Sequence, residues 1–199
     1  VESWLPVQLE TPTQGQLTKE GHGYSTVSPS LRAVGKARGS RNRGRLRFRV
    51  LVERLGETES KAKLGGGEER YQWGLFLAST DPCNRLYMMW RDGANGQARI
   101  VVQGKRNPGQ RTSGECANRG YSTVSPLQGR LVPGLVGTKG REVIVEINPQ
   151  ADGSQEMTVL VDQEQAWRGV VPKEFDPFQG QMGWRSDNLS LKFEIFEGR

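Results

Sequence analysis

The chain has 199 residues, of which 34% are hydrophobic, and it carries 26 glycines, so it has enough apolar matter for a core and is not typical of a disordered chain. One histidine and two cysteines exclude zinc sites built from several such residues and iron–sulfur clusters. The net charge is +6, and no apolar run approaches the roughly 20 residues of a membrane-spanning helix, so we expect no membrane span.

The first clear strand pattern lies at residues 45–53, where apolar and charged side chains alternate. One face carries Leu46, Phe48, Val50 and Val52. The other face carries Arg45, Arg47 and Arg49. Because successive side chains of a strand point to opposite sides, this pattern predicts a half-buried strand with a basic outer surface.

Further strand patterns follow, separated by turn residues such as Asp92-Gly93 and Asn95-Gly96. They cover residues 71–78, 86–91, 97–103, 142–147, 157–162, 166–171 and 189–196. No window of 12 residues keeps a helical apolar pattern without an interrupting glycine or proline. We therefore expect an all-β protein, an antiparallel jelly-roll β-sandwich of about a dozen strands in one domain over residues 1–199.

A seven-residue segment occurs twice: Gly-Tyr-Ser-Thr-Val-Ser-Pro fills residues 23–29 and again residues 120–126. Either the chain contains a duplication, or the two segments are identical because both must satisfy the same packing requirement. In both cases we expect two strands at equivalent or adjacent places in the fold.

The two cysteines, Cys83 and Cys116, lie in polar, glycine-rich surroundings. They could be unrelated thiols, but these surroundings favour a disulfide, which belongs to an oxidising compartment. The chain begins at Val1, as a processed secreted protein or a trimmed chain would. We expect a secreted or cell-surface location.

Basic residues are concentrated between Arg32 and Arg54, where Glu53 is the one acidic residue. The basic residues are Arg32, Lys36, Arg38, Arg41, Arg43, Arg45, Arg47, Arg49 and Arg54. Such a potential attracts acidic glycans, nucleic acid or anionic surfaces, although a solvated sheet face that keeps the protein soluble explains it as well. We expect nucleic acid to be the less favoured of these partners.

The C-terminal third resembles the concanavalin A-like lectin/glucanase superfamily, which includes laminin G-like and 3-keto-disaccharide hydrolase-like domains. The resemblance rests on a hairpin at residues 157–169 and on the polar segment 180–188 before a last strand. Gln163 replaces the usual glycine of the hairpin turn, so that turn must be built differently. The resemblance implies a sandwich fold, and several relatives bind calcium or act on carbohydrates.

Aromatic and arginine side chains form the candidate ligand surface, because sugar rings stack on aromatic faces while polar groups bond their hydroxyls. Tyr87 and Arg91 share one strand face, and Trp90 lies on the opposite face. With them we place Arg45, Arg47 and Arg49 in the candidate ligand-binding set. Asp187 and Asn188 supply oxygen atoms that suit calcium, or they form a hydrogen-bonded turn.

These observations predict a non-catalytic, extracellular carbohydrate-binding module whose partner is a polysaccharide or glycan, with acidic glycans as candidates. One alternative is a self-assembling surface subunit, a homo-oligomer in which edge strands or residues 1–9 pair with another copy. Another is a carbohydrate-active hydrolase, although the Glu-x-Asp-x-x-Glu strand motif of glucanases is missing. His22, flanked by glycines, is expected to be an exposed loop residue rather than a general base.

Overall fold

The computed structural model describes residues 2–11, 13–35, 44–57, 63–64, 68–93, 95–135 and 140–198. The regular secondary structure of these residues consists of strands and one short helix, which confirms the all-β prediction. The first strands are β1 (Ser3–Trp4), β2 (Val7–Leu9), β3 (Gln14–Glu20), β4 (Gly23–Gly35), β5 (Leu46–Glu57), β6 (Lys63–Leu64), β7 (Glu68–Glu69), β8 (Gln72–Asp81), β9 (Asn84–Asp92) and β10 (Gln97–Lys105). The helix α1 (Ser113–Cys116) precedes β11 (Tyr121–Thr123), β12 (Leu131–Pro133), β13 (Arg141–Pro149), β14 (Gln155–Val161), β15 (Glu164–Val170) and β16 (Gln181–Gly198).

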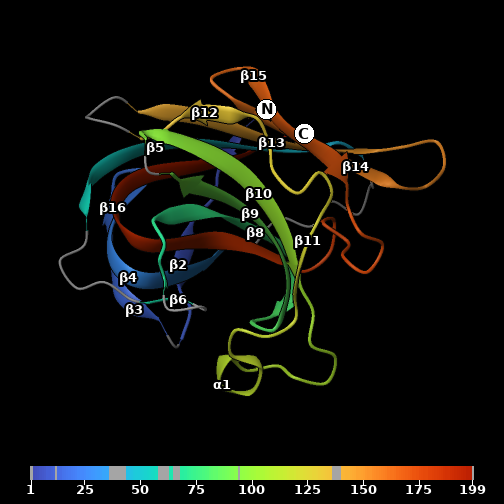
Figure 1. Cartoon of the computed structure of the whole chain (residues 1–199), viewed down its shortest axis with the longest axis horizontal. Coiled ribbons are helices and arrows are strands. Elements are labelled where there is room, and N and C mark those ends of the chain that lie inside the picture. The colour runs from blue at the N-terminus through green and yellow to red at the C-terminus, as the bar shows by residue number, and fades with distance from the viewer. Residues whose placement is uncertain are drawn as a thin grey trace.

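Two long strands, β4 and β16, run antiparallel to each other and belong to both layers of the sandwich (Figure 1). The first part of β16 pairs with β8, and the part after Asn188 pairs with β5. The front sheet therefore contains β10, β9, β8, the first part of β16, the second part of β4 and β2, with β11 and β12 on the edge of β10. The back sheet contains β15, β14, β13, β5, the remaining parts of β16 and β4, and β3. This arrangement is an antiparallel jelly-roll sandwich.

The core lies between the two sheets and is built from the alternating apolar residues of both. The predicted inner face of β5, with Phe48 and Val50 at its centre, is buried there. Stacked indole rings fill the middle: Trp73 lies 5.5 Å from Trp90 and 5.1 Å from Trp184 between ring centroids. These large rings explain why the two sheets stay together, since each buries more apolar area than any other side chain type.

The last strand is longer than predicted: β16 begins at Gln181, eight residues before the expected start at Leu189. Asp187 and Asn188 therefore lie inside a strand and not in a turn. Asn188 has a positive φ of 59° at the point where β16 leaves β8 and joins β5. Polar residues are tolerated in this buried strand because Arg185 and Asp187 form an ion pair.

The turn between β14 and β15 places Asp162 and Gln163 at φ values of 48° and 70°. Two-residue hairpin turns with positive φ at both positions favour Asn-Gly or Asp-Gly. Asp162 supports the turn, because its carboxylate accepts hydrogen bonds from Arg141 Nη1 at 2.6 Å and from the Glu142 amide at 3.1 Å.

Replacing Gln163 with glycine is expected to raise the free energy of unfolding by about 0.5–1 kcal/mol, because glycine adopts a positive φ without the Cβ penalty. Chemical denaturation measures the change. Gln165→Gly, within β15 of the same hairpin, is the control and should destabilise. Equal destabilisation by both variants would contradict this explanation of the turn.

The two copies of the seven-residue segment are neither adjacent nor equivalent, contrary to the prediction. Tyr24 in β4 is buried in the core and stacks on Phe193. Tyr121 in β11 belongs to an edge strand and packs on the outer face of the front sheet. The same sequence thus places its tyrosine in the core in one copy and on the outer face in the other. The neighbouring strands determine which side of the sheet each copy buries.

Strands of the segment at residues 1–9 pair with other strands of the same chain. Val1 lies outside the described residues. β1 pairs with β16, and β2 pairs with β4. This segment is therefore not a free strand for addition to another copy. None of the described helices has the length and apolar character needed to cross a membrane.

Candidate functional site

The outer face of the front sheet carries a grid of cationic, amide and aromatic side chains, set by strand register. Arg91 of β9 stands opposite Gln72 of β8 and Arg99 of β10. Tyr87 lies four residues before Arg91 on the same face of β9, opposite Gln103. Since alternate residues of a strand share a face, the inner residues between them enter the core.

A cleft of about 240 Å³ opens on this face. It is lined by Arg70, Gln72, Arg91, Gln103, Asn118, Tyr121 and Arg185. β8, β9, β10 and β16 supply the floor, while Asn118 and Tyr121 come from the loop and strand that follow α1. Among the described residues, the lining contains three guanidinium groups and no carboxylate, so it is suited to an anion.

The charges around the cleft are unbalanced. The cations are Arg32, Arg70, Arg85, Arg91, Lys105 and Arg185. Among the described residues, two carboxylates pair with members of this group: Glu10 with Arg85 and Asp187 with Arg185. Arg91 is held by neutral amides instead, donating to Gln72 Oε1 at 3.0 Å and to Gln103 Oε1 at 2.5 Å.

Crowding of these cations shifts their proton affinities. Burial, together with Arg70 and Arg185, lowers the pKa of Arg91 to about 10. Burial, with the Arg32, Arg185 and Arg85 charges, lowers the pKa of Lys105 to about 8. Lys105 Nζ donates to the Ala117 carbonyl at 2.6 Å, which is again a neutral partner. A bound anion would relieve this repulsion.

Tyr87 lies beneath the cleft and Tyr121 lies beside it, with ring centroids 6.0 Å apart. Tyr87 is 1% exposed, and its hydroxyl has no hydrogen-bond partner among the described residues. Burial alone would raise the pKa of Tyr87, but the charges of Arg85, Arg185, Arg32 and Lys105 together outweigh burial and lower it. Tyr121 forms part of the wall, where its hydroxyl accepts a hydrogen bond from Arg185 Nη1 at 3.4 Å, and burial raises its pKa.

Asp187 organises the floor of the cleft and is fully buried. Its carboxylate accepts hydrogen bonds from Ser30 Oγ at 2.9 Å, Gln72 Nε2 at 2.7 Å and Arg185 Nε at 2.8 Å. Asn188 donates through Nδ2 to the Arg70 carbonyl at 2.9 Å.

The Asp187 carboxylate, which was expected with Asn188 to bind calcium, is engaged by these contacts, and a cation there would have to displace the Arg185 guanidinium. Across the described ranges, no group of three or more His, Cys, Asp or Glu side chains is placed to hold a metal ion. The two residues instead fix the positions of Arg185 and of the segment that carries Arg70.

The other predicted site residues separate into different places. Arg91 lines the cleft, and Tyr87 lies directly under it as a support. Trp90 is a core residue with no exposed ring face, and its Nε1 donates to Asp92 Oδ1 at 2.8 Å. His22 lies in the β3–β4 turn against Trp4, with ring centroids 5.6 Å apart.

Arg45, Arg47 and Arg49 lie on the outer face of the back sheet, away from the cleft. Arg45 and Arg47 pair with Glu146, Arg47 and Arg49 pair with Glu2, and Arg49 also approaches Glu142. Their charge is therefore largely compensated. Lys36, Arg38, Arg41 and Arg43 of the predicted basic cluster lie outside the described residues.

Sequence reasoning missed Arg185, Gln103, Lys105 and Tyr121. Lys105 and Gln103 continue the period-two outer face of β10, so the register of that hairpin could have placed them. Arg185 could not be found this way, because its polar neighbours resemble a turn.

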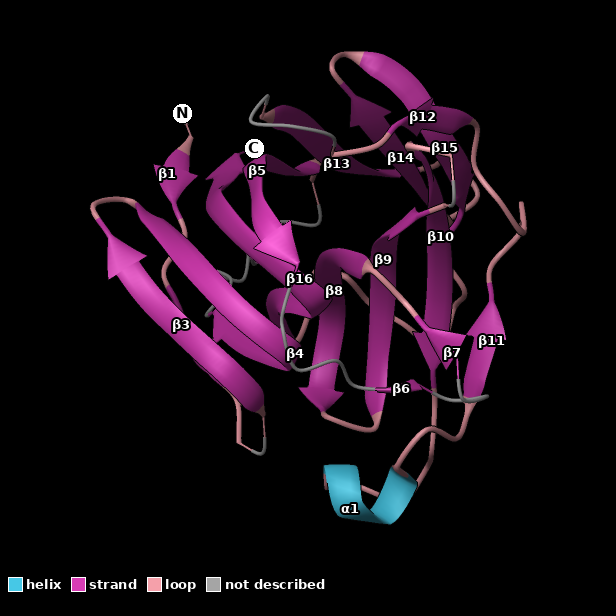
Figure 2. Ribbon diagram, turned by 60° about the vertical axis from the view of Figure 1, so that its left-hand side comes forward, coloured by secondary structure: helices cyan, strands magenta, loops and turns pink. Residues whose placement is uncertain are grey.

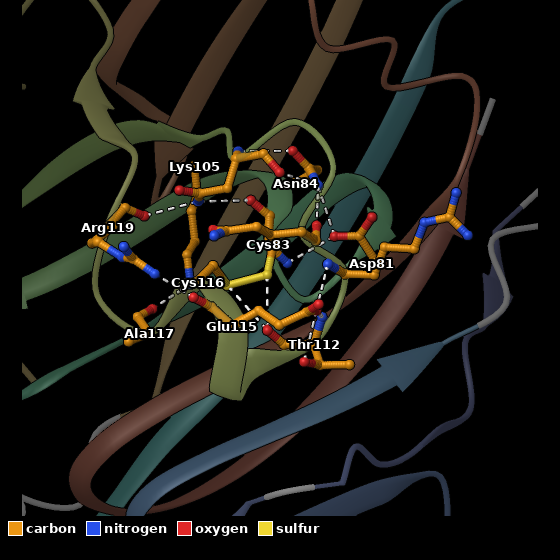
Figure 3. The surroundings of a disulfide bond; sticks show 12 residues. Asp81, Cys83, Asn84, Lys105, Thr112, Glu115, Cys116, Ala117 and Arg119 are labelled. Carbon is orange, nitrogen blue, oxygen red and sulfur yellow. Dashed lines mark hydrogen bonds between the residues drawn. A yellow bond between two sulfur atoms is a disulfide. The ribbon is translucent and has the colours of Figure 1, made fainter.

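Cys83 and Cys116 form the predicted disulfide, with a Cα–Cα distance of 5.8 Å. This bond fixes the wall of the cleft. Figure 2 shows α1 beyond the turn that joins β8 and β9. Asn84 Nδ2 donates to the Gln110 carbonyl at 3.1 Å, and Asn107 Nδ2 donates to the Arg119 carbonyl at 2.9 Å. Figure 3 shows the disulfide with Asn84, Thr112 and Glu115 around it. Glu115 accepts hydrogen bonds from the Arg111 and Thr112 amides at the start of α1. The loop that carries Asn118 is thereby attached to the front sheet at several points.

Comparisons with known proteins identify the architecture. No protein-family model matches the chain, and no curated protein matches its sequence. Among solved structures, the carbohydrate recognition domain of Emp47p superimposes with a TM-score of 0.56 at 12% identity, covering 96% of this chain and 86% of that one. The chain has the concanavalin A-like fold.

Two further structures share this fold. A legume lectin-like domain from Entamoeba histolytica matches with a TM-score of 0.52 at 10% identity, covering 97% of this chain and 89% of that one. An endo-β-1,4-glucuronan lyase from the fungus Trichoderma reesei matches with a TM-score of 0.53 at 8% identity, covering 96% and 90%. At these identities the likeness concerns the fold, and the site must be interpreted from its own residues.

Proposed function

We propose that this protein binds an acidic glycan in the cleft on the outer face of its front sheet. The observation that carries the proposal is Arg91, whose guanidinium points into the cleft between two neutral amides and beside Arg70 and Arg185. Guanidinium groups bind carboxylates and sulfates through paired, charge-assisted hydrogen bonds. The repulsion among these cations favours a ligand that brings negative charge.

The remaining lining residues suit a sugar ring. Tyr121 offers an aromatic face, while Gln72, Gln103 and Asn118 carry amides that can both donate to and accept from hydroxyl groups. The lectin domains and the glucuronan lyase named above support the proposal at the level of the fold. The Cys83–Cys116 disulfide supports an extracellular or cell-surface location.

Arg91→Gln is expected to weaken binding of a uronic acid oligosaccharide by about 10- to 100-fold, the effect of losing a charge-assisted contact. Isothermal titration calorimetry measures this, with sulfated and neutral oligosaccharides as comparison ligands. Arg168→Gln is the matched control, since Arg168 lies on β15 and pairs with Glu156. Equal affinity for neutral and acidic sugars, or an unchanged affinity in Arg91→Gln, would refute the proposal.

Binding should also depend on pH through Lys105. Its pKa of about 8 means that the free protein loses this charge as the pH rises through 8, whereas a bound anion favours the charged form. Affinity is therefore expected to be highest below pH 8 and to fall above it. Lys105→Met should give a flatter profile in the same titrations, and identical profiles for both proteins would show that Lys105 takes no part.

A second candidate function is β-elimination of a uronic acid polymer, and the position of Tyr121 favours it. An arginine that pairs with the sugar carboxylate makes the C5 proton more acidic, and the Tyr121 hydroxyl lies beside Arg185 in the same cleft. The phenolate form of Tyr121 would take the C5 proton, and because burial raises the pKa of Tyr121 the reaction is expected to be faster at alkaline pH. The C4–O bond would break as the C4=C5 double bond forms, and the departing oxygen would recover the proton from the tyrosine. The described residues that line this cleft include no carboxylate pair, so the cleft gives the hydrolase alternative no support.

The ultraviolet absorbance of the new C4=C5 bond tests this candidate. The wild type should produce it from a polyuronate, and Tyr121→Phe should bind the polymer without producing it. Binding by the wild type without any absorbance change would leave a binding module and reject the lyase.

A further inference from the structure

We infer that the cleft continues into a second acidic-sugar subsite centred on Arg99, so that the protein binds internal stretches of an anionic polymer rather than a single sugar. The inference rests on the proposed function and adds the class of ligand, a polymer with charges on successive sugars. It comes from two features of β10: the register of Arg99 with Arg91, and a second hollow that shares Arg91.

Arg99 and Arg91 stand directly opposite each other across the β9–β10 pair. Like charges in opposite positions of an antiparallel pair destabilise the sheet. Among the described residues, neither guanidinium has a carboxylate partner in this row: Arg91 donates to Gln72 and Gln103, and Arg99 donates to Gln128. Neutral amides orient both groups and leave both charges uncompensated, an arrangement that binding of anions would stabilise.

A hollow of about 510 Å³ lies on the far side of Arg91 from Tyr121. It is lined by Arg99, Val101, Gln97 and Gln128, together with Asp92, Gly93 and Asn95. Its one carboxylate among the described residues, Asp92, accepts the Trp90 Nε1 hydrogen bond through Oδ1, and its Oδ2 lies 3.9 Å from Arg54 Nη1. Because Arg91 borders both hollows, the two form adjoining parts of one surface.

The spacing of the two charges suits neighbouring sugars. Opposite side chains of paired strands have Cβ atoms about 5 Å apart, and the long arginine side chains can spread further. Val101, which is buried beside Arg91 and Arg99, gives the second hollow an apolar floor for the face of a sugar. An acidic sugar at Arg91 would thus place the acidic group of its neighbour near Arg99.

A length series that runs from the methyl glycoside of a single uronic acid to the hexasaccharide tests the inference by calorimetry, with sulfated sugars as a parallel series. For the wild type, the hexasaccharide should bind about tenfold more tightly than the monosaccharide. Arg99→Gln should leave the monosaccharide affinity nearly unchanged and remove most of the gain with length, whereas Arg99→Lys should retain part of it. Arg168→Gln is again the control.

The outcomes separate the two proposals. Monosaccharide binding that Arg91→Gln abolishes, combined with a length gain that Arg99→Gln does not change, would overturn the subsite at Arg99 and keep the proposed function. Equal weakening of both ligands by Arg99→Gln would likewise overturn a separate subsite. Absence of binding for every acidic ligand would overturn the proposed function itself.

Discussion

Asp187→Ala is expected to lower the free energy of unfolding by about 3–5 kcal/mol, because it leaves the buried Arg185 guanidinium without its carboxylate. The cost is greater here than for an ordinary buried pair, since other cations already surround Arg185 in the cleft. Ser30 and Gln72 would lose an acceptor as well. Urea denaturation followed by tryptophan fluorescence measures the loss.

An exposed ion pair provides the control. Glu164 and Arg130 form an ion pair in which both side chains are more than half exposed. Glu164→Ala breaks this pair and should lower the free energy of unfolding by less than about 1 kcal/mol. The double variant Arg185→Met with Asp187→Leu removes both charges and should be more stable than Asp187→Ala alone. Equal losses in the single and double variants would show that the uncompensated charge is not the cause.

The double variant Cys83→Ser with Cys116→Ser is expected to lower the free energy of unfolding by about 3–4 kcal/mol. The disulfide closes a loop with a sequence separation of 33 residues, and cross-linking such a loop restricts the unfolded chain by this amount. The loop carries Lys105, and the residues just beyond Cys116 include Asn118 and Tyr121, so affinity for acidic oligosaccharides should fall as well.

Reduction of the wild-type protein provides an independent version of this experiment. Reduced wild type and the double serine variant should have the same stability and the same weakened affinity. Unchanged affinity in a folded, reduced protein would show that the hydrogen bonds of Asn84 and Asn107 hold the wall without the disulfide.

Strand alternation was sufficient to predict the fold class and the buried face of β5, because one face of that strand is apolar and the other is charged. It was not sufficient in the front sheet, where β8 is buried on both faces. There, Trp90 points into the core and Arg91 points into the cleft, although both residues suit a sugar. Period two separates the two faces but does not indicate which face remains open.

The basic cluster on β5 shows a second limit. Arg45, Arg47 and Arg49 gave the clearest charge pattern, yet their partners Glu2 and Glu146 come from distant parts of the sequence and compensate them. The uncompensated cations are scattered along the chain and meet only through strand register. A local charge count therefore does not show which cations stay uncompensated, because compensation depends on tertiary contacts.

The central claim is that acidic sugars bind at the Arg91 face of the front sheet. Nuclear magnetic resonance of the arginine Nε–Hε groups tests it most directly, during titration of the full chain with a uronic acid hexasaccharide. We expect large shifts for Arg91 and Arg99 and small ones for Arg45, Arg47 and Arg49. Shifts confined to the β5 arginines, or none at a saturating excess of ligand, would contradict the account.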